Sequence, residues 1–151
     1  MVGGLQDFID SHNIGTSDGK LVLYKAVSRE WGSLYVRMVG YERGAAGAYL
    51  PGTVVRVRKW GTSREVECDY GLHVCTLSCA IGFLDCDLFF SRSDNRRRLV
   101  EVLVDPKDVV AVPFRDNGKI RCKRLVVVGE VTRKGNPRRE RDTKQGERQC
   151  V

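Results

Sequence analysis

The segment Lys20–Val27 reads KLVLYKAV and carries the strongest strand signal in the chain. Apolar residues occupy both of its alternating sets of positions, with Leu21 and Leu23 in one set and Val22 and Tyr24 in the other. Because neighbouring side chains of a strand point to opposite faces of a sheet, both faces of this strand are expected to be covered. The segment therefore predicts a strand near the middle of a sheet.

Further strand patterns follow this segment along the chain. They are separated by short polar links, which favour antiparallel pairing. Asn117–Gly118 indicates one of these links, because this pair accepts the positive backbone φ of a tight hairpin turn. The predicted strands are Thr53–Trp60, Gly71–Cys75, Leu99–Val104, Val109–Phe114 and Lys119–Val131, with a further one at Ser33–Val39.

Helix signals are fewer than strand signals. Leu5, Phe8 and Ile9 have helical spacing, which indicates a short helix near the N-terminus. Thr76 is a suitable N-cap for a helix over Leu77–Leu84. We therefore predict an α+β fold, with a mostly antiparallel sheet or partly closed barrel of about six to seven strands and one or two helices.

Length and charge divide the chain into three parts. With 151 residues it is expected to hold one domain, which we place at residues 20–132 after an N-terminal segment at 1–19. Residues 133–151 contain seven basic and three acidic residues. Their net charge of +4 is more than half of the net charge of +7 of the whole chain. They also lack aliphatic residues before Val151, so they predict a basic, disordered tail.

Composition narrows the cellular setting. No apolar run approaches the roughly 18 residues that a membrane-spanning helix requires, and the N-terminus does not have the pattern of a signal peptide. We therefore expect a cytoplasmic protein without a membrane partner, whose six cysteines are reduced thiols.

Four residues with metal-binding side chains lie close together in the sequence. Cys68, His73, Cys75 and Cys79 are candidate zinc ligands, but their spacing contains no Cys-x2-Cys knuckle. Buried free cysteines behave as small apolar residues and explain the cluster equally well. His73 is also a candidate catalytic base for Cys75, since the two are expected on the same face of a strand. The prediction is that no metal and no cofactor is bound.

Other catalytic motifs are absent from the sequence. It has no phosphate-binding glycine loop, no HExxH and no GxSxG. Glu101 and Glu130 lie on predicted central strands, where a carboxylate needs a partner. Both are therefore candidate catalytic residues or members of structural ion pairs. Whether the chain is an enzyme stays open, and the sequence favours a protein that is not an enzyme.

Basic residues gather in several short runs that are candidates for binding nucleic acid. Arg56 and Arg58 alternate along a predicted strand that ends at Trp60, whose ring is suited to stacking on a base. A basic tail holds phosphate by charge alone. The remaining basic runs are Arg96–Arg98, Arg121–Arg124 and, in the tail, Arg138 and Arg139.

Several segments in order resemble a known family, the phage rIIB-like proteins, which are relatives of the rapid-lysis B protein. The likeness covers residues 21–131 of the chain. It is carried by the segments Leu23–Val27, Leu50–Val55, Cys68–Cys75, Val102–Pro113 and Lys119–Val131.

This resemblance implies a cellular setting and does not specify a molecular activity. Proteins of this kind are encoded by tailed bacteriophages, act in the cytoplasm of the infected host, and are tied to lysis timing and to escape from host exclusion. The resemblance supplies no catalytic residues. It implies a non-enzymatic binding protein that interacts with the host, counters its defence or adjusts lysis timing, and that engages a host or phage protein.

A second likeness is to ADP-ribosyltransferase-like folds, which would imply an enzyme or a pocket for a nucleotide-like ligand. The likeness consists of the first strand, the later Gly-Leu-His ending at His73, and a glutamate on a late strand. In that family the first strand supplies a His or Arg, whereas this chain has Tyr24 or Lys25 there. Tyr24, Lys25 and His73 are accordingly the candidate ligand-binding residues. Nucleic-acid binding is the other alternative to the non-enzymatic binding protein.

Overall fold

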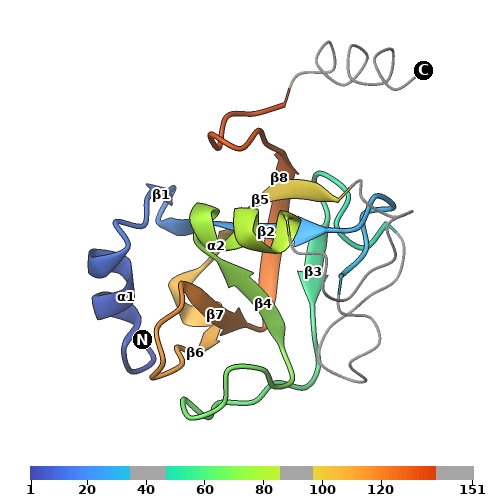
Figure 1. Cartoon of the computed structure of the whole chain (residues 1–151). Coiled ribbons are helices and arrows are strands. Elements are labelled where there is room, and N and C mark those ends of the chain that lie inside the picture. The colour runs from blue at the N-terminus through green and yellow to red at the C-terminus, as the bar shows by residue number, and fades with distance from the viewer. Residues whose placement is uncertain (35–46, 86–96, 139–151) are drawn as a thin grey trace, which may run out of the picture.

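The computed structural model describes residues 1–34, 47–85 and 97–138 (Figure 1). They form a mostly antiparallel sheet with two α-helices, which confirms the predicted α+β class. The helices are α1 (Leu5–Ser11) and α2 (Leu77–Leu84). The strands are β1 (Thr16–Ser17), β2 (Lys20–Val27), β3 (Val54–Arg56), β4 (Leu72–Cys75), β5 (Arg98–Val104), β6 (Val109–Ala111), β7 (Lys119–Cys122) and β8 (Arg124–Glu130).

The strand order in the sheet is β3-β8-β5-β2-β4-β7-β6, and β1 pairs with the start of β2. Every pairing between these strands is antiparallel. β2 lies in the middle, as KLVLYKAV predicts, and it is paired with β5 in one continuous register from Leu21↔Val104 to Val27↔Arg98. The sheet curls but does not close into a barrel.

The predicted strand Lys119–Val131 is two strands in the structure. β7 and β8 are separated only by Lys123, yet β5, β2 and β4 lie between them in the sheet. The Lys123 N–H donates to the carbonyl of Asp108 at 2.9 Å, and the Lys123 carbonyl accepts the N–H of Val57 at 3.1 Å. Because both backbone groups are bonded, the chain turns this corner without leaving either of them unsatisfied.

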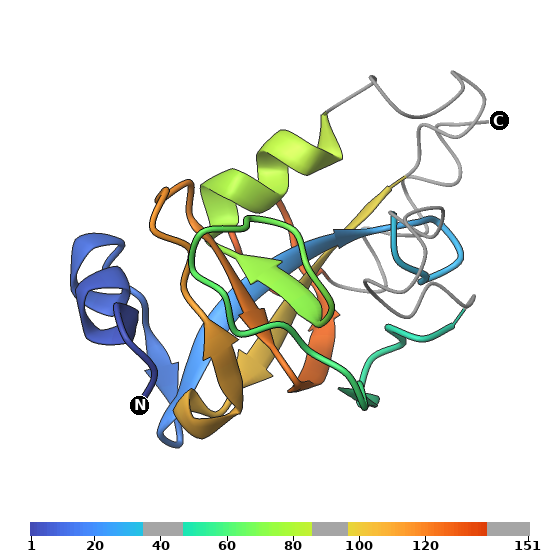
Figure 2. The same ribbon diagram turned by 90° about the horizontal axis from the view of Figure 1, so that it is seen from below.

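The curled sheet encloses the main core and carries a smaller one on its outer face. Leu21 and Leu23 of β2 point into the main core, together with Leu125 and Val127 of β8. α2 covers part of the outer face (Figure 2). There Ala80 packs with Leu99, Cys75 and Val131. The side chain of Thr76 accepts the N–H of Cys79, so the predicted cap and the predicted range of α2 are confirmed.

The folded part of the chain extends beyond the predicted limits of residues 20–132. Leu5 and Phe8 of α1 are buried in the main core, because the helix presents both from one face. After β8 the chain turns back, so that Pro137 bridges to Val131 and Arg133 pairs with Asp85 at 2.9 Å. The rest of the predicted tail lies outside the described residues.

Other predicted elements differ in length or lie in undescribed parts of the chain. The strand predicted at Thr53–Trp60 is paired only over Val54–Arg56. β6 and β7 pair as an antiparallel hairpin across Asn117–Gly118, but the connection spans residues 112–118 and is not a tight two-residue turn; Gly118 has φ +82°, whereas Asn117 does not have a positive φ. The strand predicted at Ser33–Val39 falls mainly on residues 35–46, outside the described residues.

Arg121 of β7 is fully buried and holds a long connection against the sheet. The guanidinium donates to the carbonyls of Gly61 at 2.8 Å and Val66 at 3.0 Å, and also to that of Ser63. The carboxylate of Asp69 lies 3.4 Å from it. Burial lowers the pKa of Arg121, and Asp69 opposes this shift. The connection from β3 to β4 is thus folded around one cation.

We predict that Arg121→Met lowers the free energy of unfolding by about 3 kcal/mol, because the carbonyls and the carboxylate lose a buried charged donor. Urea denaturation measures the change. Arg124→Met is the matched control, since Arg124 is exposed and the effect of a surface substitution stays within about 0.5 kcal/mol. Equal stabilities of the two variants would contradict the anchoring role of Arg121.

Candidate nucleic-acid interface

Cationic side chains gather where β3 meets the start of β8. β3 is at the edge of the sheet, and its buried Val55 alternates with exposed Arg56. The sheet register places Arg56 directly opposite Arg124. We call this group the basic edge, and it consists of Arg56, Arg58, Lys59, Trp60, Lys123 and Arg124.

The corner at Lys123 brings the parts of the basic edge together. The Val57 N–H bonds to the carbonyl of Lys123, so the chain after β3 stays beside the corner. The ammonium of Lys123 lies 5.2 Å from the ring centre of Trp60, and that of Lys59 lies 3.9 Å from the ring centre of Tyr70. Trp60 is 40% exposed. An accessible aromatic ring therefore lies among cations.

The cations of the basic edge have no ion-pair partner among the described carboxylates. Within the described parts of the chain, none of its five cations forms an ion pair with Asp or Glu. The nearby Asp69 is engaged by buried Arg121. Like charges directly opposite one another on a sheet are destabilising, and Arg56 and Arg124 have this arrangement. An anionic partner would relieve that repulsion.

A shallow groove of about 280 Å³ adjoins the basic edge at Arg124. Leu103 and Val126 line it, and Lys20 and Lys107 add two further cations. Its acidic residues are Asp105 and Asp108, of which Asp105 pairs with Lys107 at 3.7 Å. Beyond Arg124, the surface therefore carries both positive and negative side chains.

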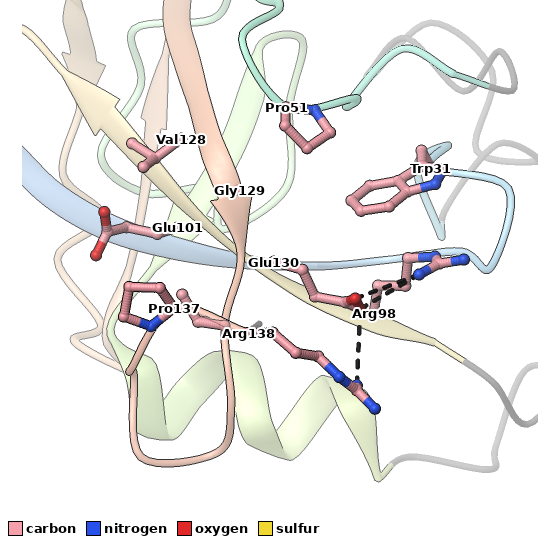
Figure 3. A pocket seen from close by; sticks show the side chains of 10 residues that line it. Trp31, Pro51, Arg98, Glu101, Val128, Gly129, Glu130, Pro137 and Arg138 are labelled. Carbon is pink, nitrogen blue, oxygen red and sulfur yellow. Dashed lines mark hydrogen bonds and ion pairs between the residues drawn. The ribbon is translucent and has the colours of Figure 1, made fainter. Parts of the chain in front are cut away.

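A larger pocket of about 430 Å³ lies at the other end of β8 (Figure 3). There Glu130, whose side chain is 10% exposed, lies between Arg98 at 3.3 Å and Arg138 at 3.8 Å. Arg98 also stacks on Trp31, with 4.3 Å from its guanidinium carbon to the ring centre, and donates to the carbonyl of Arg29. Glu130 is thus a member of an ion-pair network.

Glu101 lines the same pocket, but its carboxylate points away from the Arg98–Glu130–Arg138 network (Figure 3). Burial raises the pKa of Glu101. Tyr24 is its cross-strand partner, and its pKa is raised by burial and then by the charge of Glu101. The two candidate glutamates share a pocket but do not face one another as an acid–base pair would.

The predicted ligand-binding residues do not share one surface. Tyr24 packs in the small core beneath α2, whereas Lys25 points from the other face of β2 and is buried. The Lys25 ammonium donates to the backbone carbonyl of His73 at 2.6 Å and lies 5.4 Å from the ring centre of Tyr49. His73 lies opposite Arg121 in the sheet. Lys25 therefore has a structural role in joining β2 to β4.

The four candidate zinc ligands are also dispersed. Only Cys75 and Cys79 lie in one cluster, since Cys79 packs against the small core that contains Cys75. Cys68 is exposed, and its sulfur lies 3.5 Å from the ammonium of Lys119. Among the described residues, no three His, Cys, Asp or Glu side chains are arranged to hold a metal ion.

Comparisons of the chain with protein-family models, with curated proteins and with solved structures find no significant match. The resemblance to phage rIIB-like proteins therefore stays a prediction. In the described part of the chain, neither helix has the length and apolar character needed to cross a membrane.

Sequence patterns identified only part of the basic edge. Alternation along one strand predicts Arg56, Arg58 and Trp60; in the structure Arg56 lies opposite Arg124, and the ring of Trp60 lies beside Lys123. Lys123 and Arg124 were only part of a basic run that also contains buried Arg121. No signal in that run separates the buried arginine from the exposed one. Of the two tail candidates, Arg138 is paired with Glu130, and Arg139 lies outside the described residues.

We predict that Glu101→Gln and Glu130→Gln change stability in opposite directions. Burial raises the pKa of Glu101, so its charge increasingly disfavours the folded state as the pH rises from the ordinary glutamate pKa through that raised pKa. Glu101→Gln should therefore be more stable than the unmodified chain at neutral pH. This difference should vanish below the ordinary glutamate pKa of about 4.3.

Glu130→Gln should lower the free energy of unfolding by about 1 kcal/mol at neutral pH, because Arg98 and Arg138 lose their shared carboxylate. Urea denaturation over a pH series measures both variants, with exposed Glu65→Gln as the control. Destabilisation by Glu101→Gln at neutral pH would show that its charge is favourable in the folded protein.

Proposed function

We propose that this chain is a non-enzymatic binding protein that binds single-stranded nucleic acid through the basic edge. The observation that carries the proposal is the basic edge itself, where Lys123 lies beside the exposed ring of Trp60, Arg56 lies opposite Arg124, and none of the five cations forms an ion pair with a described Asp or Glu. Lysine and arginine side chains attract phosphates, and aromatic rings stack on bases whatever their sequence. The basic edge combines both types of group.

The shape of the surface favours a single strand over a duplex. The cations lie along one sheet edge and around a corner, and the described part of this surface contains no helix that would enter a major groove. A base must leave its stack to contact the ring of Trp60, which is easier in single strands. We therefore expect the basic edge to bind single-stranded nucleic acid more tightly than a duplex.

The phage setting belongs to this proposal as an expectation from the family resemblance. It would make the chain an accessory protein in the cytoplasm of an infected bacterium, where single-stranded nucleic acid is available during replication and transcription. Host interaction, counter-defence and lysis timing are all compatible with such binding.

A second candidate function is binding of a small nucleotide-like ligand in the pocket of Figure 3. Arg98 and Arg138 provide cations there, and Trp31 provides an aromatic ring. Glu130 neutralises part of this charge, which makes the pocket less attractive to phosphate than the basic edge. Native mass spectrometry of the purified protein tests the idea. A bound nucleotide that Arg98→Ala removes would support it, and an unliganded mass after incubation with nucleotides would oppose it.

We predict that the double variant Arg56→Ala, Arg124→Ala binds single strands at least tenfold more weakly. Each lost phosphate contact should also reduce the slope of log affinity against log salt by about 1. Trp60→Ala should weaken binding about tenfold or more with little change of that slope, because stacking is not ionic. Fluorescence anisotropy with DNA and RNA oligonucleotides of one sequence, over a salt series, measures both effects.

Lys134→Ala is the matched control for removing an exposed cation elsewhere, and it should leave the affinity within about twofold. Truncation after Arg138 separates the contribution of the basic tail. Loss of all binding on truncation, with full binding by the Arg56 and Arg124 double variant, would refute the basic edge as the binding site.

A further inference from the structure

Two cysteines are in contact at the start of α2. Cys75 is the last residue of β4, and Cys79 lies in the first turn of the helix that follows. Thr76 between them is the N-cap, so the spacing Cys-x3-Cys crosses the junction from strand to helix. Cys75 belongs to the small core under α2, and Cys79 packs against that core. The capped first turn of α2 thus positions one sulfur next to the other.

The hairpin before β7 encloses this pair. The Thr76 N–H donates to the carbonyl of Gly118 at 2.9 Å, which ties the start of α2 to the hairpin. Gly118 adopts φ +82°, and a Cβ on it would lie 3.4 Å from that of Cys79. The next residue, Lys119, brings its ammonium towards Cys79 and Cys68. A cation is therefore fixed beside the thiols by the turn that glycine permits.

The two sulfurs differ in environment. Cys75 is buried, whereas Cys79 is partly exposed. The hydrogen bond from Cys75 lowers the pKa of Cys79, and Lys119 lowers it further against the effect of burial. The same hydrogen bond and burial raise the pKa of Cys75. Cys79 is thus the more accessible thiol of the pair and the better placed to react as the nucleophile.

We propose that Cys79 is a site of oxidation by hydroperoxides and that Cys75 is its resolving thiol, so that the two form a reversible disulfide. The Cys79 thiolate attacks one oxygen of hydrogen peroxide, the O–O bond breaks, and hydroxide leaves while the sulfur is oxidised to a sulfenic acid. The Cys75 sulfur then attacks that of Cys79. The S–S bond forms, the S–O bond breaks, and the second oxygen leaves as water with the proton of Cys75.

The balance is two thiols and one hydrogen peroxide giving one disulfide and two waters. A dithiol reductant reverses it by exchange through a mixed disulfide. The new bond would join β4 covalently to α2 beside the small core under the helix. The other described cysteines are placed differently, because Cys122 is buried in the main core and Cys68 is exposed on the connection before β4.

Mass spectrometry of the peroxide-treated chain tests the proposal directly. After blocking with N-ethylmaleimide, the treated chain should have lost two hydrogens and two of the labelling sites that its six cysteines provide. Chymotryptic cleavage after Leu77, between the two cysteines, should release peptides joined through Cys75 and Cys79. Dithiothreitol should restore both labelling sites.

Three variants assign the roles of the residues. Cys75→Ser should leave the sulfenic acid on Cys79, where dimedone traps it, and Cys79→Ser should give neither dimedone adduct nor disulfide. Lys119→Met should slow oxidation of Cys79 severalfold. Cys68→Ser is the control and should form the disulfide at the unmodified rate. Mapping the disulfide in the unmodified chain tests the proposal even if a variant fails to fold.

Two results would overturn the proposal. One is a treated chain in which Cys75 and Cys79 both remain alkylated while Cys68 is oxidised. The other is a disulfide that still forms in Cys79→Ser at an unchanged rate.

Discussion

At Lys123 the backbone passes from β7 to β8, and the arrangement of the basic edge depends on how it turns there. Its N–H and carbonyl remain hydrogen-bonded, to Asp108 and Val57, so the change of direction leaves no buried backbone group unsatisfied. The turn lets the sheet curl around the main core. It also brings the chain after β3 next to the start of β8, and the basic edge exists because these two segments meet.

Residues close in sequence on the two sides of this corner have opposite roles. Arg121 points into a cage of carbonyls and the carboxylate of Asp69, where burial makes its charge costly unless every acceptor is in place. Arg124 points to solvent opposite Arg56. The contacts of Arg121 stabilise the connection from β3 to β4, which carries Trp60. The pairing of Arg124 with Arg56 leaves two like charges facing each other on the surface beside that connection. Arg121 thus anchors the connection, whereas Arg124, three positions later, belongs to the surface proposed for binding.

The sequence was most informative where local patterns coincide with the tertiary structure. KLVLYKAV predicts a central strand, and Thr76 predicts the start of α2, because covered faces and N-caps depend on a few adjacent residues. The corner at Lys123 was not predicted, since the strand pattern of Lys119–Val131 continues across it and no Gly or Pro lies next to Lys123. The burial of Arg121 depends on carbonyls some 55 to 60 residues away, which no local pattern reveals. The same limit explains why Arg56, Arg58 and Trp60 were found but Lys123 and Arg124 were not singled out.

The most direct test of the account is a nuclear magnetic resonance titration of the isotope-labelled full chain with a short single-stranded oligonucleotide. The account predicts that the largest shifts fall on residues 56–60 and 123–124 and on the indole N–H of Trp60. Shifts confined to residues 139–151, or to the pocket lined by Arg98 and Glu130, would contradict the assignment of binding to the basic edge.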